Sequence, residues 1–536
     1  MILPLVKREA WGSDACRVPT ALTYCFADGT AQIGADAFAR LNDGATAVDK
    51  GGFVRFATDS DLEARDEIYT VRVFADHIEA RFRDARGAVN AAATVSLLLN
   101  KKQLTVGEIT DYPDSAYRGF MIDMARGLPD ATLIKESITY MALAKYNRLH
   151  LHLIDAKGPC YRSDALPEYR YTGEGAVCDK AFLREIVDLC RGFAIEVIPE
   201  IEVPAHGYAF LAAYPQYVCD VPNAHSWAMC FGDDSIWEKL EALVGEIVEI
   251  FPESAYIHVG SDELEFADLE GASKRLCHWD ECPKCTAMRR REGLKDRREQ
   301  FYYVMQRMKK IVTAHGKKMI MWNDQLDSSK EISVDRDILL QFWRIAGRGR
   351  GPYEGCTMQK LAAAGFCMIN SYYPNTYLDV EHYMTPERLK KWTPCDAPDG
   401  TQIDRDRIVG GEMCAWEFGN TAEYPFYPQT TPPALAIFGD KLWSIGTREY
   451  TDEYLQALGE FVFGATLQND LFACFGSPIP PRKKDSITYV AAEEQDYARV
   501  ARCREELAAL PQRGVYRSAV GVYRDLLQKI YDKKNS

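Results

Sequence analysis

The chain has 536 residues, of which 47% are hydrophobic and 26% are charged, as in ordinary globular proteins. This length exceeds one small domain and suits a large domain with additions. Because 78 Asp and Glu outnumber 64 Lys and Arg, the net charge is −14, which argues against nucleic acid as the main partner.

The cysteines and the N-terminal stretch bear on the cellular compartment. The 16 cysteines are scattered and mostly sit in apolar runs, which predicts buried, reduced thiols rather than a disulfide framework. The first residues contain no charged segment followed by a long apolar core, so no signal peptide is expected. No apolar run reaches the length of a membrane span. If the chain begins at its natural start, we therefore expect a cytoplasmic protein that does not bind membranes.

Residues 1–112 are predicted to form a first, non-catalytic α/β domain. Alternating polarity at 69–74 and 78–82 predicts strands, and the run 87–99 predicts a helix. We expect about four strands and one or two helices in this domain. Pro113 disfavours continuation of a helix and marks the boundary.

Across residues 113–450, strand-like runs alternate with helical ones. Strands separated by crossover helices, repeated in this number, indicate an α/β fold with a (β/α)8 TIM barrel; a doubly wound open sheet is the alternative. The predicted strands are 118–124, 148–155, 194–201, 256–260, 318–322, 338–343, 366–371 and 408–414. The predicted helices include 131–145, 180–193, 235–250, 294–315 and 357–364.

Residues 451–536 form a predicted C-terminal helical region. Amphipathic stretches follow one another there, interrupted by a loop rich in proline. These helices could pack on the barrel or form a dimer contact, so the pattern is compatible with a homodimer as well as a monomer.

The stretch Tyr256–Leu264 carries the strongest candidate for chemistry. An apolar run ends in Gly-Ser and is followed by Asp262 and Glu263, which indicates a buried strand that opens into a loop. In a barrel, site residues lie at the C-terminal ends of the strands. There the two carboxylates can reach two atoms of one ligand, one for orientation and one for proton transfer. A helix N-cap is the alternative, since Ser-Asp-Glu is a common helix start.

Acidic and aromatic side chains recur at the other predicted strand ends. Aromatic walls beside acidic groups suit sugars, which offer C–H faces for stacking and hydroxyls for hydrogen bonds. Tryptophans are core residues by default, but their place at strand ends favours a pocket. The residues concerned are Asp155, Glu200, Glu202, Trp322, Asp324, Trp343, Tyr372, Tyr373, Trp416 and Glu417.

Several segments resemble, in the same order, motifs of glycoside hydrolase family 20, the β-N-acetylhexosaminidases. The resemblance covers residues 70 to about 445 and implies the family's barrel with a non-catalytic α/β domain in front. The segments are Arg118–Arg126 (RGFMIDMAR), Lys145–Asp155 (KYNRLHLHLID), Ile198–His206 (IPEIEVPAH), His258–Glu263 (HVGSDE), Trp322, Trp343, Tyr377-Leu-Asp379 and Gly411–Trp416 (GEMCAW).

The resemblance implies five catalytic residues. Asp262 would hold the N–H of the substrate's acetamide group, and Glu263 would act as general acid and then as base. Tyr377 would donate a hydrogen bond to the acetamide oxygen. Asp155 and His206 would lie behind Glu263 and tune its protonation.

The resemblance also implies residues that wall the sugar or hold its hydroxyls. Two small residues depart from the family pattern, since Ser261 and Ala205 stand where the family usually has glycine. Glu417 departs as well, because it follows the eighth-strand tryptophan directly. The implied substrate-binding residues are Arg118, Trp322, Trp343, Asp379, Trp416 and Glu417.

Some of these side chains also have structural interpretations. Arg118 could instead form a salt bridge with Asp123 or Glu412. Arg126 and Asp123 are expected to be a structural pair. Trp227 is interpreted as a structural residue.

The function implied by the resemblance is that of an exo-acting retaining β-N-acetylhexosaminidase on glycan substrates. It would release terminal β-linked N-acetylglucosamine or N-acetylgalactosamine through an oxazolinium intermediate formed by the substrate's own acetamide, without a cofactor. Alternatives are a lacto-N-biosidase or a 6-sulfo-N-acetylglucosamine-specific member of the family. The segment 344–350 is predicted to be solvated, but it could line the pocket rim and favour an anionic sugar. A non-catalytic sugar-binding barrel is the rival from another class, and the changes at Ser261 and Ala205 point to it.

His150 and His152 resemble the metal-binding pair of barrel amidohydrolases. Those enzymes need further His and Asp ligands, and this chain with its 9 histidines lacks the set. A hydrogen-bonded structural role is the favoured interpretation, and no catalytic metal is expected.

A cysteine cluster follows the fourth predicted strand. Cys282 and Cys285 form a Cys-x-x-Cys pair, which could hold structural zinc together with Cys277 or His278. Three free thiols in a loop are the alternative, because a second such pair is not apparent in the sequence.

Overall fold

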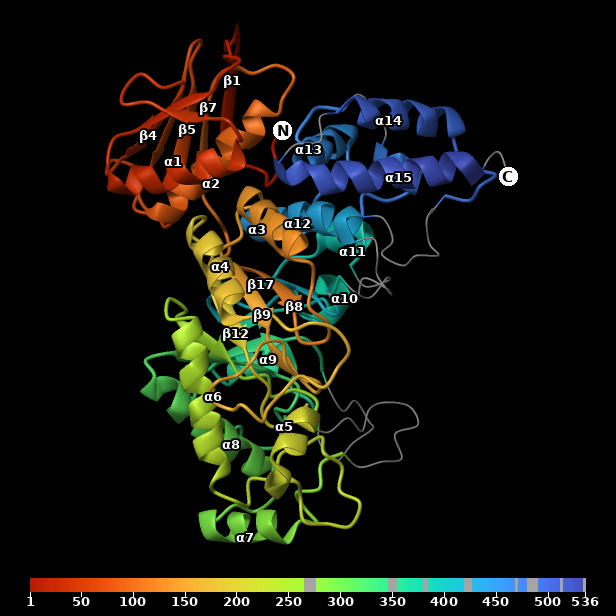
Figure 1. Cartoon of the computed structure of the whole chain (residues 1–536). Coiled ribbons are helices and arrows are strands. Elements are labelled where there is room, and N and C mark those ends of the chain that lie inside the picture. The colour runs from red at the N-terminus through yellow and green to blue at the C-terminus, as the bar shows by residue number, and fades with distance from the viewer. Residues whose placement is uncertain are drawn as a thin grey trace.

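The computed structural model has three parts (Figure 1). An α/β domain lies at one end, helices α13, α14 and α15 lie beside it, and the barrel extends away from both. The described residues are 1–264, 276–345, 354–378, 384–418, 427–467, 471–479, 490–510 and 514–533, with only the backbone described for 427–429.

The N-terminal domain is a seven-stranded sheet with two helices packed on one face. The strand order is β1-β7-β5-β6-β4-β2-β3, and α1 and α2 contact each other and the sheet (Figure 1). The expected number of strands was too low, because β1 is exposed throughout and β3 has only two residues, so neither shows an apolar alternation. The elements are β1 Arg8–Ala15, β2 Thr23–Phe26, α1 Gly29–Leu41, β3 Thr46–Ala47, β4 Val54–Thr58, β5 Tyr69–Val73, β6 Ile78–Phe82, α2 Ala85–Leu99 and β7 Thr105–Asp111.

Eight parallel strands close into a barrel in the order β8-β9-β12-β13-β14-β15-β16-β17. The pairing of β17 with β8 closes the ring, which confirms the predicted (β/α)8 barrel and excludes the open sheet. All the predicted strands are present, because strands buried on both faces give continuous apolar runs. They are β8 Tyr117–Asp123, β9 Arg148–His152, β12 Glu196–Glu200, β13 Tyr256–His258, β14 Lys318–Trp322, β15 Leu339–Phe342, β16 Met368–Asn370 and β17 Ile408–Ala415.

Side-chain caps fix where several barrel helices begin. Asp130 accepts a hydrogen bond from the backbone N–H of Thr132 at the start of α3, and Asp179 and Asp296 cap α4 and α8 in the same way. The connecting elements are β10 Ile154–Asp155, β11 Gly158–Pro159, α3 Ala131–Leu143, α4 Lys180–Arg191, α5 Tyr208–Ala213, η1 Pro215–Tyr217, α6 Ile236–Ile250, α7 Pro283–Glu292, α8 Arg297–Ala314, α9 Met358–Ala363, α10 Tyr373–Thr376, α11 Pro386–Lys391, η2 Arg405–Arg407 and α12 Tyr427–Trp443.

Buried ionic groups join the N-terminal domain to the barrel. Glu67 of the domain pairs with Arg118 of β8. Asp111 accepts hydrogen bonds from Lys145 Nζ at 2.8 Å and from Tyr69 Oη at 2.5 Å. All five residues are buried, so each charge at this junction depends on its partner across it.

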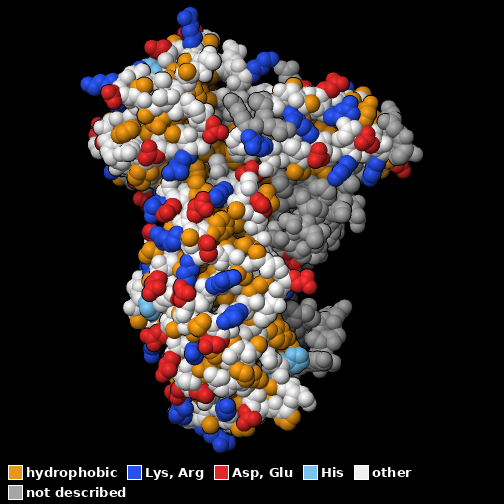
Figure 2. All heavy atoms as spheres, viewed as in Figure 1, with side chains coloured by type: hydrophobic (Ala, Val, Ile, Leu, Met, Phe, Trp, Pro, Cys, Tyr) orange, Lys and Arg blue, Asp and Glu red, His pale blue; other side chains and the backbone are white. Residues whose placement is uncertain are grey.

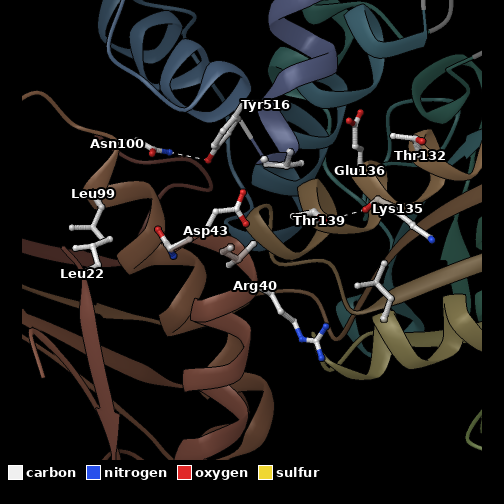
Figure 3. A pocket seen from close by; sticks show the side chains of 15 residues that line it. Leu22, Arg40, Asp43, Leu99, Asn100, Thr132, Lys135, Glu136, Thr139 and Tyr516 are labelled. Carbon is white, nitrogen blue, oxygen red and sulfur yellow. Dashed lines mark hydrogen bonds between the residues drawn. The ribbon is translucent and has the colours of Figure 1, made fainter. Parts of the chain in front are cut away.

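The C-terminal helices pack on α12 and border the N-terminal domain. Asn100 Nδ2 donates a hydrogen bond to Tyr516 Oη at 2.9 Å, next to a pocket of about 420 Å³ that opens between these helices, α1 and α3 (Figure 3). None of the described residues that line this pocket was predicted to be a site residue. The elements are α13 Asp452–Phe463, η3 Leu471–Phe475, α14 Tyr497–Ala509, η4 Gly514–Tyr516 and α15 Arg517–Lys533.

The surface carries both signs of charge. Acidic and basic side chains are interspersed over the face shown in Figure 2, so the net charge of −14 does not gather in one patch there. Within the described ranges, no helix has the length and apolar character that a membrane crossing needs.

Candidate active site

A turn after β13 presents Asp262 and Glu263 at the C-terminal end of the barrel. Gly260, Ser261 and Glu263 have positive φ values of 68°, 84° and 53°, so the turn runs outside the right-handed helical region. Gly260 is required because a Cβ there would lie 2.1 Å from Glu202 Oε2. Glu263, with its φ of 53°, is not helical, so Ser261 and Asp262 do not cap a helix that begins directly after them.

His206 lies between the carboxylates of the site. Its Nε2 is 3.6 Å from both Asp262 Oδ2 and Glu263 Oε2, and its Nδ1 is 3.4 Å from Asp155 Oδ2. Burial alone would lower the pKa of His206, but Asp155, Glu202 and Asp262 raise it well above its usual value. His206 is therefore a buried imidazolium that balances the acidic groups around it.

Asp155 holds both His206 and Arg126 in place. Its Oδ2 is 2.9 Å from Arg126 Nη2 and 3.0 Å from His152 Nε2. Burial alone would raise the pKa of Asp155, but Arg126 and His206 hold it well below its usual range. The Arg126 guanidinium also lies 4.6 Å from the centre of the Trp416 ring, so this cation stands beside the aromatic wall of the site.

Glu263 is poised to donate a proton. Burial raises its pKa, as do Asp262 and Asp324, while His206 and Arg344 lower it, and the balance is a pKa of about 7. Its backbone N–H donates to Asp324 Oδ2 at 3.2 Å, which fixes the turn. A carboxylic acid with this pKa suits general acid catalysis near neutral pH.

Asp262 offers a buried acceptor. Its Oδ2 faces His206, whereas its Oδ1 is buried and has no hydrogen-bond partner among the described residues. A buried carboxylate oxygen in this state costs free energy unless a ligand donates to it. The Oδ1 atom is therefore a ready acceptor for an N–H or O–H group of a bound molecule.

Four aromatic rings form one continuous wall at the strand ends. Trp322 and Trp416 have ring centres 6.0 Å apart, as have Trp416 and Tyr377, and Tyr377 stacks on Trp343 at 6.3 Å. Trp322 is 1% exposed and donates from Nε1 to Glu200 Oε1 at 2.7 Å, so it forms the floor of the wall. Trp343 is only half-buried, as expected for a pocket rim rather than a core, and its buried Nε1 has no partner among the described residues.

Residues 115–444 match the model of the glycosyl hydrolase family 20 catalytic domain. The chain belongs to this family. The curated relatives include the β-hexosaminidase of Porphyromonas gingivalis, 29% identical over 306 residues that cover 52% of this chain and 38% of that protein. The β-hexosaminidase of Akkermansia muciniphila is 32% identical over 238 residues, 40% of this chain and 46% of its own length. The chain thus spans less than half of these two bacterial relatives, whereas the match to human β-hexosaminidase subunit beta, 27% identical over 410 residues, covers 73% of this chain and 68% of that one.

Solved structures of family 20 proteins share the fold. The exo β-N-acetylglucosaminidase of Vibrio harveyi superposes with a TM-score of 0.71 at 19% identity, over 85% of this chain and 75% of that one. The chitobiase of Flavobacterium johnsoniae gives a TM-score of 0.69 at 20% identity, over 100% of this chain and 92% of that one. Identities this low show the common fold alone.

Arg118 does not lie at the active site of this family 20 barrel. It stands at the start of β8, so its side chain lies at the N-terminal end of the barrel, where it pairs with Glu67 and donates to the carbonyl oxygens of Lys145 and Ser115 at 2.7 Å. The prediction that Arg118 holds sugar hydroxyls is therefore wrong, and its ion-pair partner is neither of the two acids considered. Arg126, three residues beyond the end of β8, is the arginine that reaches the site.

Two further predicted residues and one segment concern the pocket rim. Glu417 follows β17, is half-buried, and donates its backbone N–H to Asp123 Oδ2 at 2.9 Å. Arg344 pairs with Asp324 at 3.1 Å and lies 4.3 Å from the Trp343 ring centre, so it is a neutralised part of the site rather than a solvated side chain. Asp379 and residues 346–350 lie outside the described residues.

Trp227 also contacts the turn that carries Asp262 and Glu263, although the sequence suggested only a structural role. Its ring lies 4.3 Å from that of His206, and its Nε1 donates to the carbonyl oxygen of Glu263 at 2.9 Å. It comes from the long segment between β12 and α6. No local pattern marks a tryptophan in a loop as a partner of another strand end, so only the folded chain identifies it.

His150 and His152 are held by carboxylates inside the barrel. His150 Nδ1 is 2.8 Å from Glu412 Oε1, and His152 Nδ1 is 2.6 Å from Glu200 Oε2. Burial alone would lower both pKa values, but the neighbouring acids raise that of His150 to about 10 and that of His152 to about 9. These contacts support the hydrogen-bonded structural role that the sequence favoured for both histidines.

Proposed function

We propose that the chain is an exo-acting retaining β-N-acetylhexosaminidase that releases terminal β-linked N-acetylglucosamine or N-acetylgalactosamine. The observation that carries the proposal is that two carboxyl groups with different properties are adjacent. Glu263 has a pKa of about 7, and the buried Oδ1 of Asp262 accepts no hydrogen bond from the described residues. The three curated relatives described above are β-hexosaminidases or a subunit of one, which supports the substrate class. The Vibrio harveyi protein is an exo β-N-acetylglucosaminidase, which supports exo action.

In the proposed reaction the substrate's acetamide group acts as the nucleophile. Glu263 protonates the glycosidic oxygen as the leaving group departs, while the acetamide oxygen attacks the anomeric carbon to give an oxazolinium ion. Positive charge that develops on the acetamide nitrogen is stabilised by Asp262, and Tyr377 donates to the acetamide oxygen. Glu263 then accepts a proton from water, which opens the oxazolinium ring with net retention.

The aromatic wall supports this assisted route. An acetamide that curls under the sugar ring must be kept in one orientation and away from water, and flat, apolar surfaces do both. Trp322 at the floor and Trp343 with Tyr377 at the side provide such surfaces beside the catalytic turn.

The test compares release of 4-nitrophenol from its β-N-acetylglucosaminide and from its β-glucoside. Cleavage of the first substrate alone supports the acetamide as nucleophile. Cleavage of both contradicts it, because the β-glucoside has no acetamide. The Glu263→Gln variant separates the roles further, since a poor leaving group such as a second sugar needs the acid more than nitrophenol does. We therefore expect a larger loss on the disaccharide than on the aryl substrate.

The rival non-catalytic barrel rested on Ser261 and Ala205. Ser261 is buried and donates from Oγ to the carbonyl oxygen of Trp322 at 3.1 Å, and the side chain of Ala205 is fully buried. Both residues are thus accommodated without displacing the acids. Absence of cleavage of either aryl substrate would favour this rival, or the specialised substrates, over our proposal.

The compartment and the assembly stay predictions. We propose a cytoplasmic protein, on the sequence features given above, and a homodimer through the C-terminal helices as its assembly. Light scattering after size-exclusion chromatography distinguishes a dimer from a monomer, and localisation of the tagged full-length protein tests the compartment.

A further inference from the structure

Four buried cysteines from two loops meet at one point. Cys219 and Cys230 belong to the segment between β12 and α6, while Cys282 and Cys285 stand at the start of α7. Their four Sγ atoms all lie within 4.8 Å of one another. Cys219 is 4% exposed and the other three are fully buried, so these sulfur atoms face each other rather than solvent.

The spacing of the sulfur atoms fits a metal ion better than disulfide bonds. Cys230 Sγ is 3.4 Å from Cys285 Sγ and 3.7 Å from Cys282 Sγ, whereas a disulfide joins two sulfurs at about 2.0 Å. Four thiolates placed about 2.3 Å from a tetrahedral zinc ion lie about 3.8 Å apart. One sulfur with two near neighbours is expected in a tetrahedron, whereas a disulfide gives each sulfur one partner. We propose that Cys219, Cys230, Cys282 and Cys285 bind a structural zinc ion.

The surroundings of the sulfurs support this assignment. The backbone N–H groups of Gly232 and Cys285 lie near the sulfurs of Cys230 and Cys282, respectively, as outer-shell donors do around metal-bound sulfur. A Cβ on Gly232 would lie 2.4 Å from the carbonyl carbon of Lys284, so the two cysteine-bearing turns touch with no room for a side chain.

The zinc site accounts for the order of a lobe with little regular structure. Residues 218–235 and 276–282 contain no helix or strand, so few backbone ladders hold them. Contacts within the lobe include the hydrogen bond from Trp279 Nε1 to the carbonyl oxygen of Met229 at 2.8 Å. A zinc ion that joins the two loops supplies the stability that such a small core lacks.

The same lobe reaches the active site. Trp227 is three residues before Cys230 and donates to the carbonyl oxygen of Glu263. The zinc ion therefore has a positioning role, because it fixes the loop that holds Trp227 against the backbone of the catalytic turn. α7 lies at the end of the molecule opposite the N-terminal domain (Figure 1). The ion therefore joins the two cysteine-bearing loops at the end of the molecule that the N-terminal domain does not contact.

This geometry corrects the predicted zinc ligands, because the sequence suggested Cys277 or His278 as the partner of Cys282 and Cys285. Cys277 and His278 are not members of the group that could hold the ion, and the second pair of sulfurs comes from Cys219 and Cys230 instead. Cys277 is 2% exposed and belongs to the same lobe. It is therefore a matched control, because Cys277→Ala removes a buried thiol there without removing a ligand.

The test measures metal in the full-length chain purified without chelators. Elemental analysis should find one zinc ion per chain in the wild type and in Cys277→Ala, and its loss in Cys282→Ala and in Cys219→Ala. Zinc retained in both ligand variants would overturn the assignment. So would wild-type protein that contains iron in place of zinc, or metal-free protein in which mass spectrometry finds disulfides among these four cysteines.

A second measurement covers the case in which the ligand variants do not fold. Wild-type protein produced with cobalt should show the intense visible bands of tetrahedral Co²⁺ and the near-ultraviolet charge-transfer band of thiolate ligands. A cobalt spectrum without thiolate charge transfer would contradict the four-sulfur site. Neither readout depends on turnover, so failure of the proposed glycosidase function would leave this test unaffected.

Discussion

Replacing His206 by asparagine tests how the protonation of Glu263 is set. His206 Nε2 lies 3.6 Å from Glu263 Oε2, and this cation is the main group that opposes the raised pKa of Glu263. Asparagine is the suitable replacement because residue 206 has a φ of 54°, which asparagine adopts more readily than other uncharged residues of its size. The variant removes the charge and adds little backbone strain.

The distance sets the size of the expected effect. Two unit charges 3.6 Å apart interact by about 5 kcal/mol at an effective dielectric constant of about 20. At about 1.4 kcal/mol per pKa unit, loss of the cation would raise the pKa of Glu263 by at most about 3. Water that enters the vacated space screens the acids that now raise this pKa, so we expect an increase of roughly one to three.

The assay is the pH dependence of kcat/KM on 4-nitrophenyl β-N-acetylglucosaminide. In the proposed mechanism Glu263 is a general acid, which is active below its pKa, so activity is lost as the pH rises through this pKa. Wild-type activity should fall above about pH 7, and the fall should move upward by roughly one to three pH units in His206→Asn. His315→Asn, at the C-terminal end of α8, is the control and should leave the profile in place. A basic limb that stays at the wild-type pH in His206→Asn would refute the reasoning.

Three further predictions concern other contacts. Asp262→Asn should lower kcat on N-acetylglucosaminides by roughly two to four powers of ten, since it removes the charge that stabilises the developing cation in the proposed mechanism; turnover near that of the wild type would contradict this role. Trp227→Phe keeps the ring but loses the hydrogen bond to Glu263, so we expect a lower kcat with a nearly unchanged KM in steady-state assays; an unchanged kcat would show that the contact does not position the acid. Arg118→Met leaves the buried Glu67 with Arg86, 3.8 Å away, as its remaining ion-pair partner, and should cost about 3 kcal/mol in the free energy of unfolding by denaturant titration; a raised KM in protein of normal stability would instead restore the sugar-binding role.

The barrel could be predicted from the sequence because its strands are buried on both faces. The run Lys318–Trp322, for example, is apolar along most of its length, and a turn with an acidic residue follows it. The same logic located Asp262 and Glu263, since strand ends are where a barrel keeps its site. Strands at the edge of the N-terminal sheet were not predicted, because an exposed strand such as Arg8–Ala15 shows no apolar run or alternation.

The two arginines of the first barrel strand show why position along a strand matters more than membership of a motif. Arg118 and Arg126 belong to the same segment, and they stand before and after the body of β8. Because side chains at the two ends of a strand lie at opposite faces of the barrel, only Arg126 could reach the C-terminal site. Applied to these two residues, the rule that site residues lie at the C-terminal strand ends would have been enough to choose Arg126 over Arg118.

The cysteine group and Trp227 depended on tertiary packing. Cys219 and Cys230 are far in sequence from Cys282 and show no short spacing of their own. Their meeting follows from the adjacency of β12 and β13 in the barrel, which places the two following loops side by side. A single sequence carries no local signal for such a contact.

The junction between the N-terminal domain and the barrel limits how the protein can be truncated. Arg118 and Lys145 belong to the barrel, yet their carboxylate partners Glu67 and Asp111 belong to residues 1–112. A barrel separated from that stretch would keep two cations without their counter-charges, so we expect the two parts to unfold in a single transition. The N-terminal domain thus provides the barrel with counter-charges that the barrel needs in order to fold. Shortening the protein to its barrel would require neutral, well-packed replacements at both cations before the cut is made.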